Sequence, residues 1–161
     1  MILTIPLILF FLLVFFLLWK FVKTIDERKW LTFIVSVLFT PLLYFYLFYP
    51  LLNIFSNYHH QKYFDTIAWK ETPKLRFEMS NQIVDRQLFK DKTKSEVQNS
   101  LGTSEWFGWD EQIKENSPEK WNYNLGFKPG AFNTQQECLE LVFKNGIVVK
   151  STQYQMEKTA Y

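Results

Sequence analysis

The residues able to carry out chemistry in this chain are few and scattered. The 161-residue sequence has one cysteine, Cys138, and two histidines, the adjacent pair His59 and His60. A nucleophilic cysteine needs a base beside it, and Cys138 lies far along the chain from both histidines, in a segment typical of a strand. Adjacent histidines point in different directions on a helix or a strand, and no third ligand accompanies them. We therefore predict no catalytic residue, no metal site and no cofactor.

The most conspicuous carboxylate, Glu96, has a structural interpretation. It follows Thr93 by three residues, and Thr-x-x-Glu is the pattern of a helix capping box, so Thr93 and Glu96 are expected to cap a helix. The five glycines stand one at a time and form no phosphate-binding loop. Residues 56–161 hold fourteen basic and fourteen acidic side chains, which excludes the concentrated basic surface of a nucleic-acid binder. Neither a nucleic acid nor a small-molecule substrate is expected as a partner.

Aromatic residues are unusually concentrated in one part of the C-terminal half. Seven of them stand within 27 positions: Trp106, Phe107, Trp109, Trp121, Tyr123, Phe127 and Phe132. Trp121 and Tyr123 alternate with Leu125 and are expected in the core. Tryptophan and tyrosine dominate binding hot spots because they bury a large area with little loss of rotamer freedom. We therefore assign an exposed partner-binding loop to Trp106, Phe107, Trp109 and Phe132, with the core as the alternative location.

The N-terminal third is predicted to cross a membrane twice. Residues 1–19 contain no charged side chain and span roughly 29 Å as a helix, near the thickness of the hydrocarbon layer. A cleaved signal sequence is the alternative, but Lys20 and Lys23 stand where small residues would be needed. Residues 30–55 form a second uncharged run, in which Pro41 is expected to bend the helix.

The charges between these runs predict the orientation. Four basic residues lie in the ten-residue connection: Lys20, Lys23, Arg28 and Lys29. Basic residues next to membrane helices are retained on the cytoplasmic side. Both ends of the hairpin and everything after it are therefore expected on the exoplasmic face of a cytoplasmic membrane, which is the periplasm in a double-membrane bacterium. The inverted arrangement is the alternative.

Residues 56–73 are interpreted as a juxtamembrane linker, and residues 74–161 as a soluble α+β domain. An amphipathic helix is expected after Pro73, where Leu75, Met79 and Ile83 recur at helical spacing. A second helix begins at Thr93, and Gly102 is expected to end it in the left-handed conformation.

Strand patterns follow. Residues 121–125 alternate, and two further apolar segments flank Asn145-Gly146, the dipeptide typical of a type I′ hairpin turn. A two-residue turn places Phe143 opposite Val148 and Leu141 opposite Lys150, with Ser151 on the solvent side. Residues 103–120 have little pattern and are interpreted as an elaborated loop, with room for a short extra strand. The predicted architecture is a membrane-anchored αα-βββ domain with a three-stranded antiparallel sheet.

This order of motifs resembles the SmpA/OmlA (BamE-like) family of small envelope proteins over residues 74–154. The likeness rests on Met79 and Ile83, on the segments 92–97 and 101–102, and on the strands 121–126 and 139–148. It implies a β-lactamase-inhibitor-protein-like fold of two helices on a three-stranded sheet. Together with the predicted membrane hairpin, it suggests a non-enzymatic interaction module that contacts the lipid bilayer and another envelope protein, with a role in envelope assembly. An immunity or enzyme-inhibitor protein acting at the membrane is the alternative.

Overall fold

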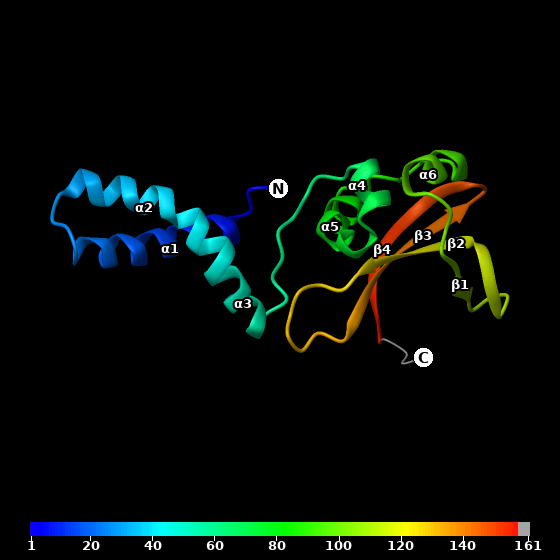
Figure 1. The fold of residues 1–161 in the computed structure, drawn as a ribbon. Coiled ribbons are helices and arrows are strands. Elements are labelled where there is room, and N and C mark those ends of the chain that lie inside the picture. Colours follow the sequence, from blue (N-terminus) through cyan, green and yellow to red (C-terminus); the bar gives the residue numbers. More distant parts are fainter. Residues whose placement is uncertain (158–161) are drawn as a thin grey trace. The chain divides into compact units, whose positions relative to one another are not determined.

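The computed structural model describes residues 1–157, and the chain divides into two compact units. The helical unit comprises Ile2–His60 together with the short segment Pro129–Phe132. The sheet unit comprises Gln61–Lys128 and the chain from Asn133 onward. The protein is α+β: apolar N-terminal helices precede short helices and a four-stranded antiparallel open sheet (Figure 1).

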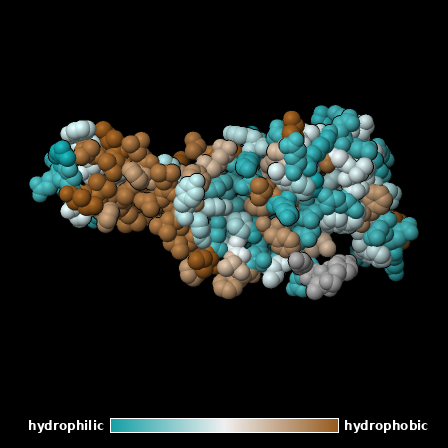
Figure 2. All heavy atoms as spheres, viewed as in Figure 1, coloured by the Kyte–Doolittle hydropathy of each residue, from teal (hydrophilic) through white to brown (hydrophobic). Residues whose placement is uncertain are grey.

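The helical unit is a hairpin of two long helices. Helix α1 (Ile5–Lys23) begins at Thr4, and α2 (Lys29–Leu43) continues through a π-helical turn, η1 (Tyr44–Phe48), into α3 (Tyr49–Phe55). Both Ile5–Lys23 and Lys29–Phe55 are long and apolar enough to cross a membrane. Hydrophobic residues cover this unit in Figure 2. The first helix thus runs four residues beyond the predicted end at residue 19.

Small hydroxyl residues line the buried face of α2. Thr32, Ser36 and Thr40 recur every four residues and are almost fully buried. Their polarity is satisfied locally. The Thr32 hydroxyl donates to the carbonyl of Asp26, before the helix (3.0 Å), the Ser36 hydroxyl donates to the Thr32 carbonyl (2.7 Å), and the Thr40 hydroxyl donates to the Ser36 carbonyl (2.6 Å). Small side chains of this kind let apolar helices approach closely.

The second long helix changes direction between α2, which contains Pro41, and α3, as Figure 1 shows. Proline removes a main-chain donor, and the regular α-helix gives way three residues later to η1, where the Tyr49 N–H donates to the Tyr44 carbonyl. Tyr44 is fully buried and packs with Leu7 and Val14 of α1.

Four short helical segments open the sheet unit: α4 (Thr66–Glu71), the 3₁₀ turn η2 (Pro73–Leu75), α5 (Phe77–Asp85) and α6 (Lys94–Leu101). The predicted capping box is confirmed, with Thr93 as N-cap and Glu96 bonded back to it. Gly102 ends α6 at φ 85° and ψ −171°, so its φ is positive but it is not in the left-handed helical conformation that was predicted.

The segment interpreted as a linker is part of the fold. Residues 66–71 form α4, and Trp69 is fully buried among the core residues of the sheet unit. The six-residue helix is too short to show a helical periodicity of apolar residues, so the burial of Trp69 could not be recognised from the local sequence.

The sheet has four strands rather than the predicted three: β1 (Trp106–Asp110), β2 (Glu115–Gly126), β3 (Gln135–Lys144) and β4 (Ile147–Glu157). Neighbours in the sequence are neighbours in the sheet, and all pairs are antiparallel. The additional strand, β1, lies in the segment interpreted as a loop. It is only five residues long and has a central glycine, which explains why its pattern is weak.

The β3–β4 hairpin combines a confirmed turn with a shifted register. Asn145 (φ 54°) and Gly146 (φ 77°) adopt the positive φ of a type I′ turn, and Phe143 pairs with Val148. An irregularity then follows, so that Leu141 pairs with Ser151 and not with Lys150 as predicted. One extra residue in β4 turns Ser151 toward the core, where it is 4% exposed, so its predicted solvent position is wrong.

The core of the sheet unit lies between the helices and one face of the sheet. Its buried apolar side chains come from all three α-helices, the α5–α6 connection and strands β2 to β4: Trp69, Phe77, Met79, Ile83, Phe89, Val97, Leu101, Tyr123, Leu125, Leu139, Leu141, Phe143 and Val148. The helices therefore cover one face only.

Candidate functional site: the edge strand β1

The two edge strands of the sheet, β1 and β4, differ in how far other segments cover them. The start of β4 is covered by the segment before α6: the Asp91 N–H donates to the Val148 carbonyl (3.0 Å), and the Val148 N–H donates to the Lys92 carbonyl (2.9 Å). Thr93 adds a bridge to Ile147. Strand β1, in contrast, pairs with β2 alone among the strands of residues 1–157. Its outer edge can therefore offer main-chain groups to another strand.

Two of the predicted binding residues lie side by side on β1. Phe107 is 44% exposed and Trp109 is 53% exposed, and alternation along the strand puts them on the same face. Phe107 is the cross-strand partner of Trp121, whose ring centroid lies 4.8 Å from that of the buried Phe143. A row of aromatic rings thus runs from the core across the sheet to its open edge.

The other two predicted residues lie elsewhere. Trp106 is opposite the buried Asn122 and is itself partly buried, on the face of the sheet that the helices do not cover. Phe132 is 84% exposed but belongs to the helical unit. The structure therefore brings together Phe107 and Trp109 and puts Trp106 on the opposite face of the strand, while Phe132 belongs to the other unit.

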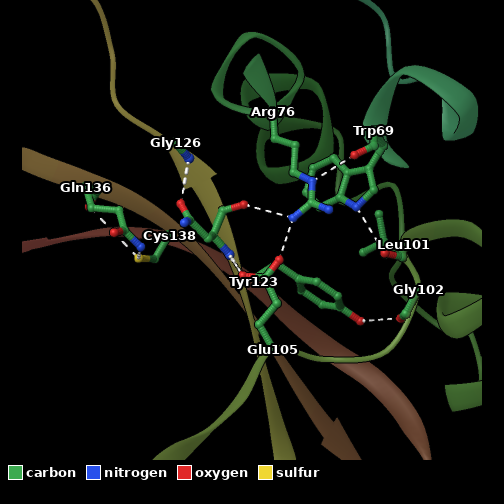
Figure 3. Close-up of polar contacts among 10 residues, drawn as sticks. Trp69, Arg76, Leu101, Gly102, Glu105, Tyr123, Gly126, Gln136 and Cys138 are labelled. Atoms are coloured by element: carbon green, nitrogen blue, oxygen red, sulfur yellow. Dashed lines mark hydrogen bonds and ion pairs between the residues drawn. The ribbon is translucent and has the colours of Figure 1, made fainter. Parts of the chain in front are cut away.

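Hydrogen bonds from the core hold the chain that enters β1. The Trp69 indole N–H donates to the Leu101 carbonyl (3.1 Å), and the Tyr123 hydroxyl donates to the Gly102 carbonyl (3.2 Å). Both donors are fully buried in the core. Figure 3 shows the two bonds reaching the end of α6 from Trp69 and Tyr123.

The buried guanidinium of Arg76 fixes Glu105, the residue just before β1. The Arg76 Nη1 lies 2.6 Å from a carboxylate oxygen of Glu105 and also donates to the Asn124 carbonyl (3.1 Å) (Figure 3). The second Glu105 oxygen accepts from the Asn124 N–H (3.1 Å), and the Glu105 N–H donates to the Asn122 carbonyl (2.9 Å). The Arg76 side chain is only 9% exposed, so its charge depends on these partners. Glu105 thereby fixes the start of β1 against β2.

The far end of β1 is held by a tight turn. The Asp110 carboxylate accepts from the Gln112 N–H (2.9 Å) and lies 3.5 Å from the Lys120 ammonium. The hydrogen bond from the Gln112 N–H lowers the pKa of the Asp110 carboxyl more than the nearby Lys120 does. Lys120 also donates to the Trp109 carbonyl (2.9 Å). With both ends anchored, the strand presents Phe107 and Trp109 from a fixed backbone.

The glycine at the centre of β1 has a packing role. A Cβ at position 108 would approach a Glu140 carboxylate oxygen to 2.7 Å and the Asn122 amide nitrogen to 2.9 Å. These side chains cross over the strand at this point on the face that the helices leave uncovered. A side chain at position 108 would therefore displace them.

Groups with possible chemistry belong to other elements than this strand. Cys138 is buried, and burial raises the pKa of its thiol, which keeps it protonated at neutral pH. His60 belongs to the helical unit, where its Nε2 lies 2.9 Å from the Tyr44 hydroxyl. Within residues 1–157, no three His, Cys, Asp or Glu side chains are grouped as metal ligands.

Comparison of the chain with models of protein families, with curated proteins and with solved structures finds no match. The molecule is thus defined by its architecture: two apolar helices followed by an α+β unit with an open antiparallel sheet. The resemblance to SmpA/OmlA proteins stays a prediction.

Sequence reasoning missed the anchors of the site. The predicted linker contains Trp69, and the local sequence predicts no partner for Arg76, yet both residues support β1. Arginine and glutamate separated by 29 residues carry no local signal that they pair.

Proposed function

We propose that this protein is a non-enzymatic, membrane-anchored interaction module. The helical hairpin anchors it in the cytoplasmic membrane, and the sheet unit, on the exoplasmic side, binds an extended segment of a protein partner along β1. The partner strand would pair with the main chain of β1 and place apolar side chains against Phe107 and Trp109.

The contrast between the two sheet edges carries this proposal. An exposed apolar edge strand is a hazard that proteins usually limit with charges, bulges or covering segments. Here β4 is covered at its start by residues 91–94 and is rich in polar residues toward its end. The β1 strand has one charged residue, Asp110, and two exposed aromatic rings, and its register irregularity between Phe107 and Gly108 lies in the pairing with β2. An edge left open in this way, and anchored at both ends, fits strand addition.

The membrane part of the proposal is supported by composition and length. Two helices are apolar enough to cross a membrane, and Lys20, Lys23, Arg28 and Lys29 lie at or next to their connection. Arg28 is bonded to the neighbouring Asp26 carboxylate (2.7 Å), which leaves the three lysines as the less compensated charges. Basic residues in a short connection favour its retention in the cytoplasm.

Site-specific photocrosslinking in intact cells tests the proposed function. A photoreactive amino acid replaces Trp109 in the full chain, and a matched control carries it at Val149, which is 46% exposed on the other edge strand, β4. Both positions are exposed and apolar in character, so folding is expected to be kept. We expect a discrete protein adduct from position 109 and at least a tenfold weaker one from position 149.

Two results would contradict this function. Equal adducts from the two positions would mean that exposure alone decides the reaction. Adducts to lipid only from position 109 would assign the aromatic residues to a membrane surface instead of a protein.

A further inference from the structure

From the sequence of β1, we infer that its partner strand is the β1 of a second copy of this chain. The inference rests on the proposed function, because it identifies the partner of the same edge. It depends on one property of the strand, namely that its residues are nearly symmetric about the centre. The order Trp106-Phe107-Gly108-Trp109-Asp110 has an aromatic residue on each side of the central glycine.

Antiparallel pairing of two copies with Gly108 opposite Gly108 gives a two-fold arrangement. Phe107 of each copy then lies directly opposite Trp109 of the other, and the same contact forms twice, as a two-fold interface requires. Cross-strand aromatic pairs on one face stabilise antiparallel strands. Because Phe107 and Trp109 are the exposed side chains of β1, this pairing covers the apolar surface that the single sheet leaves open.

The charges of the strand tolerate this arrangement. Asp110 is the only charged residue of β1 and falls opposite the neutral Trp106 of the other copy, while the two Asp110 residues lie at opposite ends. Glu105, just before the strand, is already paired with Arg76. No like charges therefore oppose each other within the paired strands.

Gly108 at the two-fold centre brings no side chain of its own to the contact. Directly opposed residues in an antiparallel pair come as close as about 4.5 Å between Cα atoms, and glycine presents no side chain there. Joining two β1 edges makes one continuous sheet and removes both open edges at once. The contact is short, below the size of a standard stable interface, so it depends on anchoring of both copies in one membrane, which raises their effective concentration.

Disulfide crosslinking in membranes tests the register. Two full-length variants, Phe107→Cys and Trp109→Cys, are expressed separately or together and exposed to a mild oxidant. Opposed residues lie about 4.5–5.5 Å apart, whereas 107–107 and 109–109 pairs are diagonal neighbours at about 7–8 Å, beyond easy disulfide reach. We expect at least fivefold more crosslinked dimer from the mixture than from either variant alone.

Two controls accompany this experiment. The unsubstituted chain, whose Cys138 is buried, reports any background, and Val149→Cys reports random collision at an exposed position of the other edge. A Val149→Cys yield equal to that of the mixture would overturn the inference, as would equal yields from the mixture and the single variants.

A charge-swap pair gives a second, independent measurement. The double variant Phe107→Lys with Trp109→Glu places opposite charges face to face in both contacts, whereas Phe107→Lys with Trp109→Lys places like charges there. Both variants lose the same two aromatic rings from exposed positions. We expect at least tenfold more untagged chain to copurify with a tagged copy for the Lys/Glu variant than for the Lys/Lys variant, and equal recovery would overturn the inference.

The photocrosslink from position 109 distinguishes the proposed interaction module from the pairing of two copies through β1. An adduct of the chain with itself supports both of them. An adduct with a different protein, without the 107–109 disulfide, keeps the interaction module and overturns the pairing of two copies. Absence of any protein adduct and of the disulfide overturns both.

Discussion

The guanidinium of Arg76 lies over the indole ring of Trp69, with 4.8 Å between the guanidinium carbon and the ring centroid. The Arg76 Nε also donates to the Trp69 carbonyl at 2.8 Å. Trp69 comes from α4 and Arg76 from the start of α5, and together they reach Leu101, Glu105 and Asn124. The segment after the helical hairpin is thereby made part of the sheet unit, and it supports the strand proposed to bind.

This relationship predicts where the sheet unit begins. A fragment of residues 61–157 retains Trp69 and is expected to fold without the hairpin, whereas a fragment of residues 74–157 loses the buried indole and its bond to Leu101. We expect cooperative urea unfolding for the longer fragment and a lower midpoint, or no transition, for the shorter one. Equal midpoints would show that α4 contributes nothing to the core.

Two tryptophans are expected to behave oppositely in the longer fragment. Trp69→Ala removes a fully buried ring and is expected to cost about 3–5 kcal/mol of unfolding free energy. Trp109→Ala changes a half-exposed ring and is expected to change that free energy by about 0.5 kcal/mol or less. Urea denaturation followed by circular dichroism measures both. A large loss for Trp109→Ala would place it in the folding core and not on a binding edge.

The capping box predicts an acid-dependent part of the stability. The Thr93 N–H bond, with help from Lys92 and the Thr93 hydroxyl, lowers the pKa of Glu96 from 4.5 to about 2. Because the pKa is lower in the folded state, the stabilisation is fully present above about pH 4.5 and is lost as the pH falls through about 2.

Glu96→Gln should therefore lower the urea midpoint at pH 7, and the difference from the parent fragment should shrink as the pH falls from about 5 toward 2. Glu111→Gln, at an exposed position whose carboxylate makes none of these cap bonds, is the matched control. A difference that stays constant with pH would contradict the role of Glu96 as an ionised cap.

A substitution at Gly146 in the β3–β4 turn is expected to lower the unfolding free energy through the backbone conformation alone, without steric overlap. Gly146 has φ 77°, and a Cβ placed there meets no atom within 4 Å. Gly146→Ala is therefore expected to cost about 1–2 kcal/mol from the positive φ alone. Asn145→Gly, at φ 54°, keeps a residue that tolerates this conformation and serves as the control, with a smaller change in unfolding free energy. The reverse order would contradict a type I′ turn.

The orientation of the hairpin is predicted to depend on its connection. A reporter active only outside the cytoplasm, fused to the C-terminal end, should be active in the parent chain. Replacing Lys20, Lys23, Arg28 and Lys29 with glutamine, while adding lysines before Ile2, should move the population toward the inverted form. The chain should remain in the membrane after alkaline carbonate extraction in both cases. Unchanged reporter activity would contradict the topology.

Local sequence patterns determined the elements that need only near neighbours. Uncharged runs predicted both apolar helices, Thr93 and Glu96 predicted a cap, and Asn145-Gly146 predicted a hairpin turn. In each case the physical cause acts over a few residues: the absence of charge along a helix, a side chain bonded three positions away, or a tolerated positive φ. These features could therefore be recognised without a tertiary structure.

Tertiary contacts decided the rest. The burial of Trp69, the pairing of Arg76 with Glu105 and the extra residue that turns Ser151 inward all depend on partners far along the chain. The status of β1 as the open edge depends on which strands pair and on residues 91–94 covering β4. Alternation in the sequence indicates which faces a strand has, but only the assembled sheet determines which edge lacks a neighbour, because edge hydrogen bonds form between main-chain groups that every residue carries.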